Sequence, residues 1–361
     1  MKAAIFNGPG KPLEIEEISI GDPGPREVRI RTAYAGLCHS DLHFLEGSFP
    51  FATPAVLGHE SAGVVEEVGS EVEYVKPGDH VITCLSAFCG YCDHCLSGYP
   101  NRCGGRATDR RAGEPPRLSK NGKVVHQFAH LSSFAEQMLV HENAIVKIRT
   151  DMPLDRAALI GCGVTTGVGA VLRTAQVEPG SIVAVIGCGG IGLSAINGAK
   201  IAGAGRIIAV DRLPAKLDLA RTFGATDLVN TNDGDPVKQV KDLTGGGVHY
   251  SFEAIGLKVT AEQAWGMLRA GGTATVIGMI PPGQKVEIPG LDLLSEKKLQ
   301  GSMMGSNRFR IDMPRFVDFY LSGQLHLDEL ISSRIKLEEI NDAMELLKGG
   351  EVARQVINFG A

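Results

Sequence analysis

The chain has 361 residues, of which 43% are hydrophobic and 21% charged, with a net charge of −5. At about 100–200 residues per domain, this length predicts two domains, and the composition excludes wholesale disorder. The sequence contains no run of Lys and Arg that would bind nucleic acid or an anionic membrane. No stretch approaches the roughly 18–20 uninterrupted apolar residues of a membrane span, and the N-terminus lacks the apolar segment of a secretory signal. We therefore expect a cytoplasmic globular protein without nucleic-acid or membrane partners.

Residues 1–150 contain short β-type runs punctuated by Gly and Pro. The clearest runs are EVRIRT (27–32), AGVVEEV (62–68) and DHVIT (79–83). This pattern predicts a barrel-like or irregular domain built mainly of strands. Residues 104–123 are polar and rich in Gly, Arg and Pro, and we expect them to form a long surface loop.

From about residue 163 the pattern changes to alternating strands and helices. Strands are expected at 182–186, 206–210, 227–230, 249–253 and 273–278, and helices at 190–202 and 215–223. This alternation predicts a doubly wound parallel sheet. After about residue 305 we expect helix and short strand again, ending in a strand at 355–359.

A glycine-rich motif joins the first of these strands to its helix: Gly187-Cys-Gly189-Gly190-Ile191-Gly192. The first glycine permits a tight turn, the second lets the backbone approach a pyrophosphate, and the third allows the helix to pack closely on the strand. The N–H groups at the start of the helix would face the phosphates. The motif and its context predict a dinucleotide site.

Asp211 ends the next strand and can accept hydrogen bonds from the ribose hydroxyls of the adenosine. Its carboxylate would repel a 2′-phosphate, which favours NAD(H) over NADP(H). The neighbouring Arg212 weakens this preference, since Arg suits a 2′-phosphate. Lys216 is either an adenosine-ribose contact or a solvated side chain on its helix.

Four cysteines lie within fifteen residues, in the order Cys89-x-x-Cys92-x-x-Cys95-x7-Cys103. Four thiolates suit tetrahedral Zn²⁺ and leave no open position, so the predicted site is structural. An iron–sulfur cluster is the rival, but the run lacks the C-x3-C-P continuation of ferredoxins. We expect His94, inside the loop, to be a surface residue.

Spacing alone makes no second metal site from the remaining Cys and His residues. Three segments, however, resemble the zinc-dependent medium-chain alcohol dehydrogenases: Gly36-Leu-Cys38-His39-Ser40-Asp41-Leu-His43, Gly58-His59-Glu60-x-x-Gly63 and Gly161-Cys162-Gly163-x-x-Thr166-Gly167. The four-cysteine run and the glycine motif occur in the same order as in that family. The likeness covers essentially the whole chain, and its length and the loop at 104–123 resemble the longer, liver-type-like and typically dimeric branch.

The resemblance implies an α/β chain with a GroES-like, mainly-β catalytic domain (1–163 and 305–361) and a Rossmann NAD-binding domain (164–304). It also implies a homodimer with two Zn²⁺ per chain, the catalytic ion being held by Cys38, His59 and Cys162, with a fourth position open to water or substrate. Glu60 would lie near the metal, and Asp41 would hydrogen-bond His59 and set its tautomer. Cys84 and Cys188 match no ligand position and are interpreted as packing residues.

The same resemblance implies the chemistry: zinc acts as a Lewis acid on an alcohol while hydride passes to NAD. Ser40 and His43 match the proton relay of the family. His39 and Arg354 match contacts to the coenzyme pyrophosphate, Thr166 is expected beside the nicotinamide, and Ile280 beside the coenzyme.

The loop after the first metal ligand carries apolar side chains where glutathione-adduct formaldehyde dehydrogenases have acidic ones and one more residue. These are Phe44, Leu45, Phe49 and Phe51, and Leu85, Phe134, Met279 and Ile280 are further candidates for an apolar wall. They favour an alcohol, aldehyde or ketone with an apolar or aromatic body, although each could also be core packing.

Two rival functions remain. One is a thiol-adduct dehydrogenase that binds the carboxylates of its conjugate through Arg106, Arg110 and Arg111. The other is a non-catalytic zinc and nucleotide-binding protein.

Overall fold

The computed structural model describes residues 1–104, 108–111, 113–350 and 352–360. They form two compact units. Unit 1 comprises Met1–Cys162, Arg308–Gly323 and Leu327–Ala361, and unit 2 comprises Gly163–Asn307 and Gln324–His326. Arg106, one candidate for binding a conjugate, lies outside the described residues.

Unit 1 is built mainly of strands, in agreement with the sequence. Its strands are β1 (Lys2–Phe6), β2 (Glu14–Glu17), β3 (Ser19–Ile20), β4 (Glu27–Gly36), β5 (Ala55–Val56), β6 (Glu60–Val68), β7 (His80–Thr83), β8 (Leu118–Lys120), β9 (Lys123–Val124), β10 (His126–Gln127), β11 (Gln137–His141), β12 (Ile145–Lys147), β19 (Ile331–Ile335) and β20 (Arg354–Asn358). Its α-helices are α1 (His39–Leu45), α2 (Asp93–Leu96), α3 (Leu154–Leu159), α9 (Phe309–Leu321) and α10 (Ile340–Gly349). Its 3₁₀ turns are η1 (Pro100–Arg102), η3 (Phe128–His130), η4 (Glu142–Ala144), η10 (Asp328–Leu330) and η11 (Leu337–Glu339).

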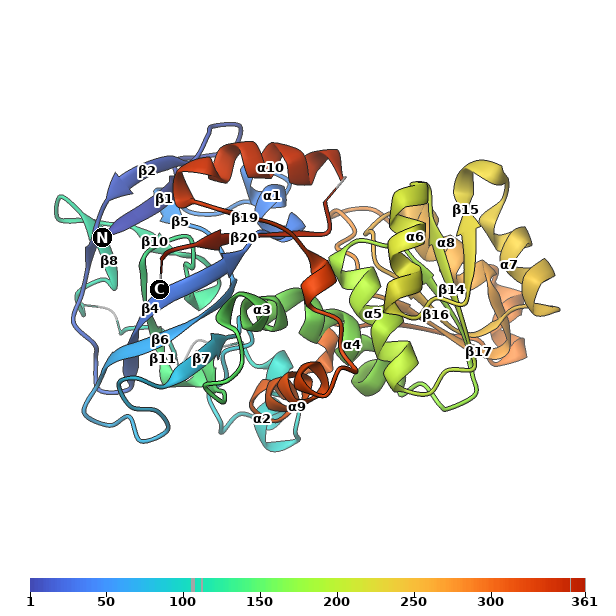
Figure 1. Cartoon of the computed structure of the whole chain (residues 1–361), viewed down its shortest axis with the longest axis horizontal. Helices are drawn as coiled ribbons and strands as arrows, with labels where there is room; N and C mark the ends of the chain where they lie inside the picture. The colour runs from blue at the N-terminus through green and yellow to red at the C-terminus, as the bar shows by residue number, and fades with distance from the viewer. Residues whose placement is uncertain (105–107, 112, 351, 361) are drawn as a thin grey trace. The chain divides into compact units, whose positions relative to one another are not determined.

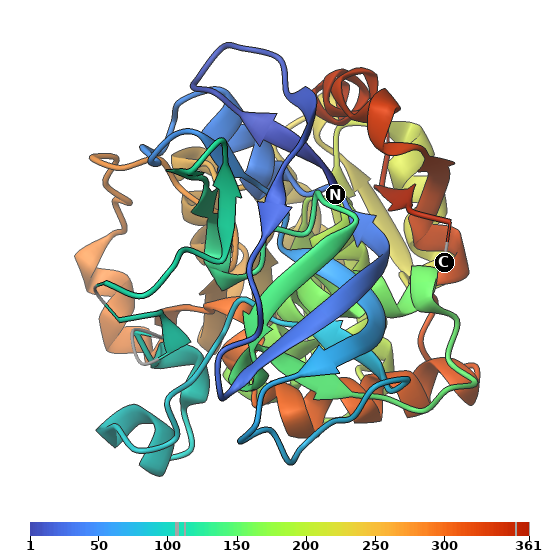
Figure 2. The same cartoon turned by 90° about the vertical axis from the view of Figure 1, so that its left-hand side faces the viewer.

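The long strand β4 organises the largest sheet of this unit, whose order is β12-β7-β6-β4-β20-β19 with β11 also paired to β4. Figure 2 shows β4 in dark blue between the green β11 and the lighter blue β6. The other sheets have the orders β10-β5-β1-β2 and β3-β8-β9. Since β4 ends two residues before Cys38 and β6 begins directly after His59, the central sheet carries two predicted metal ligands near the ends of paired strands.

The expectation of one long surface loop at 104–123 is wrong in its second part. Arg117 and Leu118 are buried, and β8 pairs with β9 as a hairpin. The turn of this hairpin is Asn121-Gly122, and both residues have positive φ (50° and 76°). Asn-Gly is a favoured pair for such two-residue turns, so the sequence did contain a signal for it.

Unit 2 contains the predicted parallel sheet, with the strand order β15-β14-β13-β16-β17-β18. These strands are β13 (Ile182–Ile186), β14 (Arg206–Asp211), β15 (Asp227–Asn230), β16 (Val248–Glu253), β17 (Leu268–Val276) and β18 (Lys298–Gly301). The helices are α4 (Thr165–Gly169), α5 (Gly190–Ile201), α6 (Pro214–Phe223), α7 (Pro236–Thr244) and α8 (Lys258–Gly266), with short turns η7 (Thr231–Asp233), η8 (Gly290–Ser295) and η9 (Met304–Ser306). When the six strands are numbered from β13 in chain order, their order in the sheet is 3-2-1-4-5-6, the doubly wound dinucleotide-binding topology.

The helices of unit 2 follow local signals. Asp235 caps α7 by accepting the N–H of Val237, Pro236 occupies its first turn, and Gly245 ends it in the left-handed conformation. Helix α5 packs against α6, and α7 against α8 (Figure 1). The sheet core consists of apolar strand residues such as Ile186 and Val210, which the structure buries completely. Each such side chain contributes about 1.5–3 kcal/mol, so the apolar runs in the sequence account for these strands.

One helical segment in the described part of the chain, Leu154–Ala175, is long and apolar enough by length and composition to cross a membrane. It includes α3, a π-helical turn at Ile160–Val164 (η5), α4 and a second π-helical turn at Ala170–Ala175 (η6). Of its most apolar window, 83% is buried inside the protein, as in a core helix.

Candidate active site

Three metal-ligating side chains from distant parts of the chain converge in unit 1. Cys38 precedes α1, His59 precedes β6, and Cys162 lies in the π-helical turn η5. Their ligand atoms lie within 4.8 Å of one another, and the three residues are at most 4% exposed. Such π-helical turns often occur at functional sites. Two thiolates and one imidazole fit a zinc ion that keeps one position open, so the donor set suits the predicted catalytic ion.

Asp41 holds the side chain of His59 and the backbone of Cys38, the residue before α1, in place. It is fully buried, and its carboxylate accepts the N–H groups of Gly58 (3.1 Å) and Cys38 (3.3 Å). Its Oδ1 also lies 3.1 Å from Nδ1 of His59. A proton on Nδ1 therefore points at Asp41, which leaves Nε2 unprotonated for a metal.

Glu60 and Arg354 form a buried charged pair behind the ligands. Nε of Arg354 lies 3.5 Å from Oε1 of Glu60, and both side chains are at most 5% exposed. A Cβ on Gly36 would come within 2.3 Å of that same Oε1, so the glycine makes room for the carboxylate. The hydrogen bond with Cys162 and the charge of Arg354 place the pKa of Cys38 well below its usual range, although burial opposes this.

A buried nitrogen atom of Arg354 supports its predicted role as a contact to an anion. Its Nη2 is buried and has no hydrogen-bond partner within the described part of the chain. An orphaned donor of this kind matches the predicted pyrophosphate contact, which itself stays a prediction.

The residues of the predicted proton relay lie on α1. Oγ of Ser40 is 3.7 Å from Sγ of Cys38. His43 follows three residues later and is therefore on the same face of the helix, with its ring 6.0 Å from that of Phe49. His39, the predicted pyrophosphate contact, is exposed on the same helix.

An aromatic cluster lies beside the metal ligands. Phe44 contacts Phe49 and Phe51, with ring centroids 5.8 and 5.9 Å apart. Phe128 contacts Phe44 (4.7 Å), Phe51 (5.3 Å) and the ring of His59 (5.8 Å). Phe128 could not be selected from the sequence, because it belongs to no motif and lies 69 residues after His59.

The other residues predicted to form an apolar wall differ in how deeply they are buried and in which core cluster they contact. Phe134 is fully buried in the core of unit 1, which agrees with the alternative that it is a core-packing residue. Phe44, Leu45 and Phe51 are partly buried against the same core. Leu85 packs against a second core cluster.

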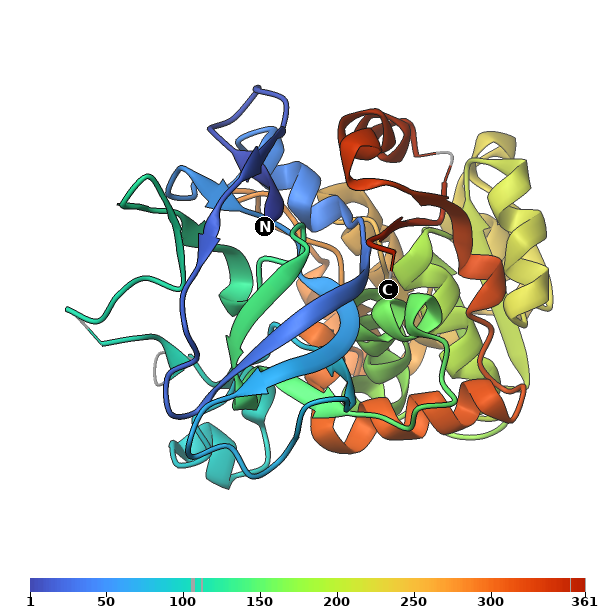
Figure 3. The same ribbon diagram turned by 60° about the vertical axis from the view of Figure 1, so that its left-hand side comes forward.

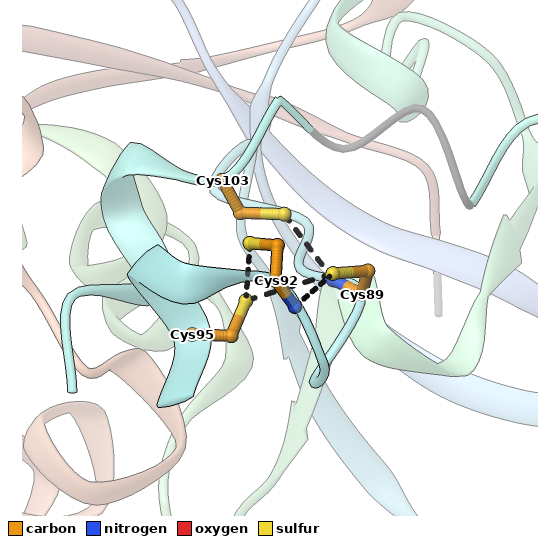
Figure 4. Close-up of side chains that lie close together, drawn as sticks. All are labelled: Cys89, Cys92, Cys95 and Cys103. Carbon is orange, nitrogen blue, oxygen red and sulfur yellow. Dashed lines mark hydrogen bonds between the residues drawn. The ribbon is translucent and has the colours of Figure 1, made fainter. Parts of the chain in front are cut away.

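The four-cysteine lobe forms a closed set of sulfurs (Figure 4). The Sγ–Sγ distances are 3.5 Å for Cys92–Cys95 and 3.8 Å for Cys89–Cys95. Zn–S bonds of about 2.3 Å give a tetrahedron with edges of about 3.8 Å, so the spacing fits zinc. Burial raises the pKa of Cys89, but the N–H groups of Tyr91 and Cys92 outweigh it and lower the pKa to about 6. The lobe projects from unit 1 at the lower left of Figure 3, in cyan.

The glycine motif of unit 2 has the predicted geometry. Gly187 has a φ of +94°, and a Cβ on Gly192 would lie 1.7 Å from the carbonyl oxygen of Gly187. A Cβ on Gly189 would meet no atom within 4 Å, which leaves the open space that an approaching phosphate requires. Gly190 and Ile191 begin α5 at this point. The turn therefore fits a pyrophosphate at the N-terminus of α5.

Asp211 does more than the sequence suggested. Its carboxylate accepts the N–H groups of Cys188 (2.8 Å), Arg212 (2.7 Å) and Leu213 (3.0 Å). It therefore ties the glycine turn to the start of α6, and only its remaining lone pairs are available to a ribose.

The other predicted coenzyme residues are placed as follows. Thr166 is buried in α4, where its Oγ1 lies 3.3 Å from Sδ of Met304. Lys216 is half-buried in the first turn of α6, and Ile280 follows β17. Cys84 and Cys188 are buried and belong to neither group of metal ligands.

Comparison with known proteins agrees with this geometry. Residues 24–150 match the family of alcohol dehydrogenase GroES-like domains, and residues 190–322 match that of zinc-binding dehydrogenases. The chain is 42% identical to alcohol dehydrogenase class-3 of Pisum sativum, over 99% of this chain and 97% of the relative. It is 41% identical to S-(hydroxymethyl)glutathione dehydrogenase of Escherichia coli O139:H28, over 99% of each chain. The crystal structure of benzyl alcohol dehydrogenase from Acinetobacter calcoaceticus superposes with a TM-score of 0.94 at 32% identity, covering 99% of this chain and 98% of that one.

The chain thus belongs to the zinc-dependent medium-chain alcohol dehydrogenase family. It is an NAD-dependent oxidoreductase that acts on alcohols and their carbonyl products and uses two zinc ions, as the two sets of ligands indicate.

Proposed function

We propose that this enzyme oxidises primary or secondary alcohols with an apolar or aromatic body, and reduces the corresponding aldehydes and ketones. The observation that carries the proposal is the cluster of Phe44, Phe49, Phe51 and Phe128 beside the imidazole of His59. Phenyl groups pack well edge-to-face against such rings. The likeness to a benzyl alcohol dehydrogenase supports the same substrate class.

In this proposal each polar residue has a defined task. Zinc, when bound by Cys38, His59 and Cys162, supplies a Lewis acid, and NAD supplies the hydride acceptor. Asp41 orients His59. The Ser40 hydroxyl would accept the proton of the alcohol as it passes its own proton on through the coenzyme ribose to His43, which exchanges a proton with solvent.

Each unit carries predicted coenzyme contacts. In unit 1, His39 and Arg354 are assigned to the pyrophosphate, and in unit 2 the backbone of the glycine motif is assigned to phosphate groups. Thr166 and Ile280 lie against the nicotinamide half, and Asp211 and Lys216 bind the adenosine ribose. Glu60 pairs with Arg354 and, as the family resemblance implies, would lie near the catalytic metal.

The thiol-adduct dehydrogenase is the second candidate, because relatives at 41–42% identity carry that name or the class-3 name. One observation opposes it. Arg110, offered as a carboxylate-binding residue, is already engaged: its Nε and Nη2 bind Glu27, and Nη1 binds the carbonyl of Pro115 (2.7 Å). It is only 15% exposed at its side chain, so it does not present its charge to a ligand.

Steady-state kinetics distinguishes the two candidates. With NAD present, we expect kcat/KM for benzyl alcohol to exceed that for ethanol and for the adduct of formaldehyde with glutathione. A preference for the adduct by tenfold or more would replace the first candidate with the second. Zinc analysis separates both from a non-catalytic protein, since an enzyme should bind two ions per chain and a lapsed site only the structural one.

We also propose that the enzyme is a homodimer formed through unit 2. Strand β18 is at the edge of its sheet, and Leu291, Leu293 and Leu294, in the turn η8 that precedes it in the chain, are 79%, 53% and 82% exposed. An edge strand with exposed apolar neighbours is a template for pairing with a second copy about a two-fold axis. Leu294→Asp should yield monomers in light scattering, whereas Leu346→Asp, on the exposed face of α10, should not; dimers of both variants would refute this interface.

We place the protein in the cytoplasm, since all eight cysteines are free and seven serve as predicted zinc ligands, which a reducing compartment preserves. Cell fractionation tests this, and recovery in an oxidising compartment would contradict it.

A further inference from the structure

The segment that carries Phe128 is a strained turn. Ala129, His130 and Ser132 have φ angles of 52°, 61° and 63°, in the left-handed region that residues other than glycine rarely adopt. Such strain persists only where surrounding contacts determine the conformation, and it gathers at functional sites. The turn follows β10 and ends before Phe134 enters the core.

The hydroxyl group of Ser132 closes this turn. Its Oγ accepts the N–H of Phe128 (2.9 Å) and donates to the carbonyl oxygen of Val56 (2.8 Å). Its N–H also donates to the carbonyl oxygen of Phe128 (3.0 Å). Ser132 is 1% exposed. One buried hydroxyl thus joins both ends of the turn to a strand that ends three residues before His59.

A second layer of polar contacts supports the turn from the loop at 104–123. Nε2 of Gln127 donates to the carbonyl oxygens of Leu131 (3.2 Å) and Leu139 (2.9 Å). Its Oε1 accepts from Arg117 (2.9 Å). His130 pairs with Asp109 at 2.9 Å. The described part of this loop therefore buttresses the turn.

We propose that Ser132 is a positioning residue for substrate selection: it holds the ring of Phe128 against His59 and so fixes the aromatic cluster beside the metal ligands. The inference rests on the proposed oxidation of aromatic alcohols. Ser132 touches neither the metal ligands nor the substrate, and it acts through Phe128. Loss of its hydroxyl frees the Phe128 amide and lets the turn relax from its strained conformation.

The test compares Ser132→Ala with Ser133→Ala in the full-length, zinc-loaded enzyme. Both serines are at most 1% exposed. Oγ of Ser133, unlike that of Ser132, has no hydrogen-bond partner among the described residues, so its removal costs no bond. Alanine tolerates the left-handed backbone in this turn, as Ala129 shows.

Two readouts are needed. The first is the ratio of kcat/KM for benzyl alcohol to that for ethanol. In Ser132→Ala this ratio should fall by about tenfold, because a small displacement of the aromatic cluster beside the metal ligands affects the larger substrate more. The second is hydrogen exchange of the Phe128 amide, which should accelerate by about tenfold or more. Ser133→Ala should match wild type in both, and both variants should keep two zinc ions.

An unchanged ratio in Ser132→Ala, an equal fall for both alcohols, or an equal effect of Ser133→Ala would overturn the proposal. If the wild-type enzyme does not oxidise benzyl alcohol, the proposed substrate class fails. Exchange of the Phe128 amide then decides whether Ser132 positions the turn, and an unchanged rate would refute it.

Discussion

Replacing Asp41 with Asn tests the link between the fold and the catalytic metal. The carboxylate accepts three N–H groups, from Cys38, Gly58 and His59, in a fully buried setting. An amide of the same shape has one acceptor oxygen, so its NH₂ group must face at least one of these donors. The imidazole also loses the negative charge that favours a proton on Nδ1.

The expected magnitude follows from these contacts. Leaving a buried donor unsatisfied costs about 1–3 kcal/mol. Loss of an outer partner of a zinc-binding histidine typically weakens metal binding by about 10–100-fold, which corresponds to roughly 1.4–2.7 kcal/mol. We therefore expect Asp41→Asn to bind the catalytic zinc 10–100-fold more weakly and to leave the four-cysteine zinc unchanged.

Chelator competition measures this directly, because the two ions should be lost in separate phases. Asp155→Asn is the matched control. Asp155 is also a buried carboxylate of unit 1, but it pairs with Arg156 and Arg334 rather than with a metal ligand. It should lower stability and spare zinc affinity. If Asp41→Asn released its catalytic zinc no more readily than wild type does, Asp41 would not orient His59.

Three further outcomes follow. Ser40→Ala should lower kcat by about 100-fold while two zinc ions remain; wild-type turnover would exclude Ser40 from the relay. Asp211→Gly should raise the ratio of kcat/KM with NADP to kcat/KM with NAD at least tenfold. It should also lower the melting temperature, because three N–H groups lose their acceptor. An unchanged coenzyme ratio would show that Asp211 does not bind the ribose. Burial, with Arg26 next, lowers the pKa of His141 from 6.5 to about 4. As the pH falls, His141 is therefore protonated in the unfolded chain before it is protonated in the folded protein. This lowers the free energy of unfolding by about 2 kcal/mol between pH 6.5 and pH 4, allowing for partial solvent screening. His141→Asn keeps an acceptor for the N–H of Asn143 and should flatten urea-unfolding stability over that range, whereas an equally steep profile would rule this origin out.

Local chemistry explains which features could be predicted. The glycine motif works through backbone conformation and close approach, which Gly187 and Gly192 impose within six residues. The four cysteines enclose an ion within fifteen residues. The parallel sheet could be predicted because strands buried on both faces must be continuously apolar.

Other features escaped prediction for physical reasons. The hairpin at residues 118–124 is masked in the sequence by the polar composition around its Asn121-Gly122 turn, which predicts a loop. Phe134 and Phe128 could not be told apart from sequence: both are aromatic residues in one short segment. Both side chains pack in the core of unit 1, but a strained turn also places the ring of Phe128 beside that of His59.

Residue types and short-range spacing alone determined the alternation of elements, the dinucleotide turn and the structural zinc lobe, since each depends on neighbours in the chain. Only the tertiary structure decided that Asp41 serves Cys38, Gly58 and His59 together, that Arg110 is held by Glu27, and that Ser132 bridges Phe128 and Val56. These contacts join residues that are far apart in the sequence and meet only after folding. Residue types and their spacing along the chain do not indicate which of them will be neighbours in space.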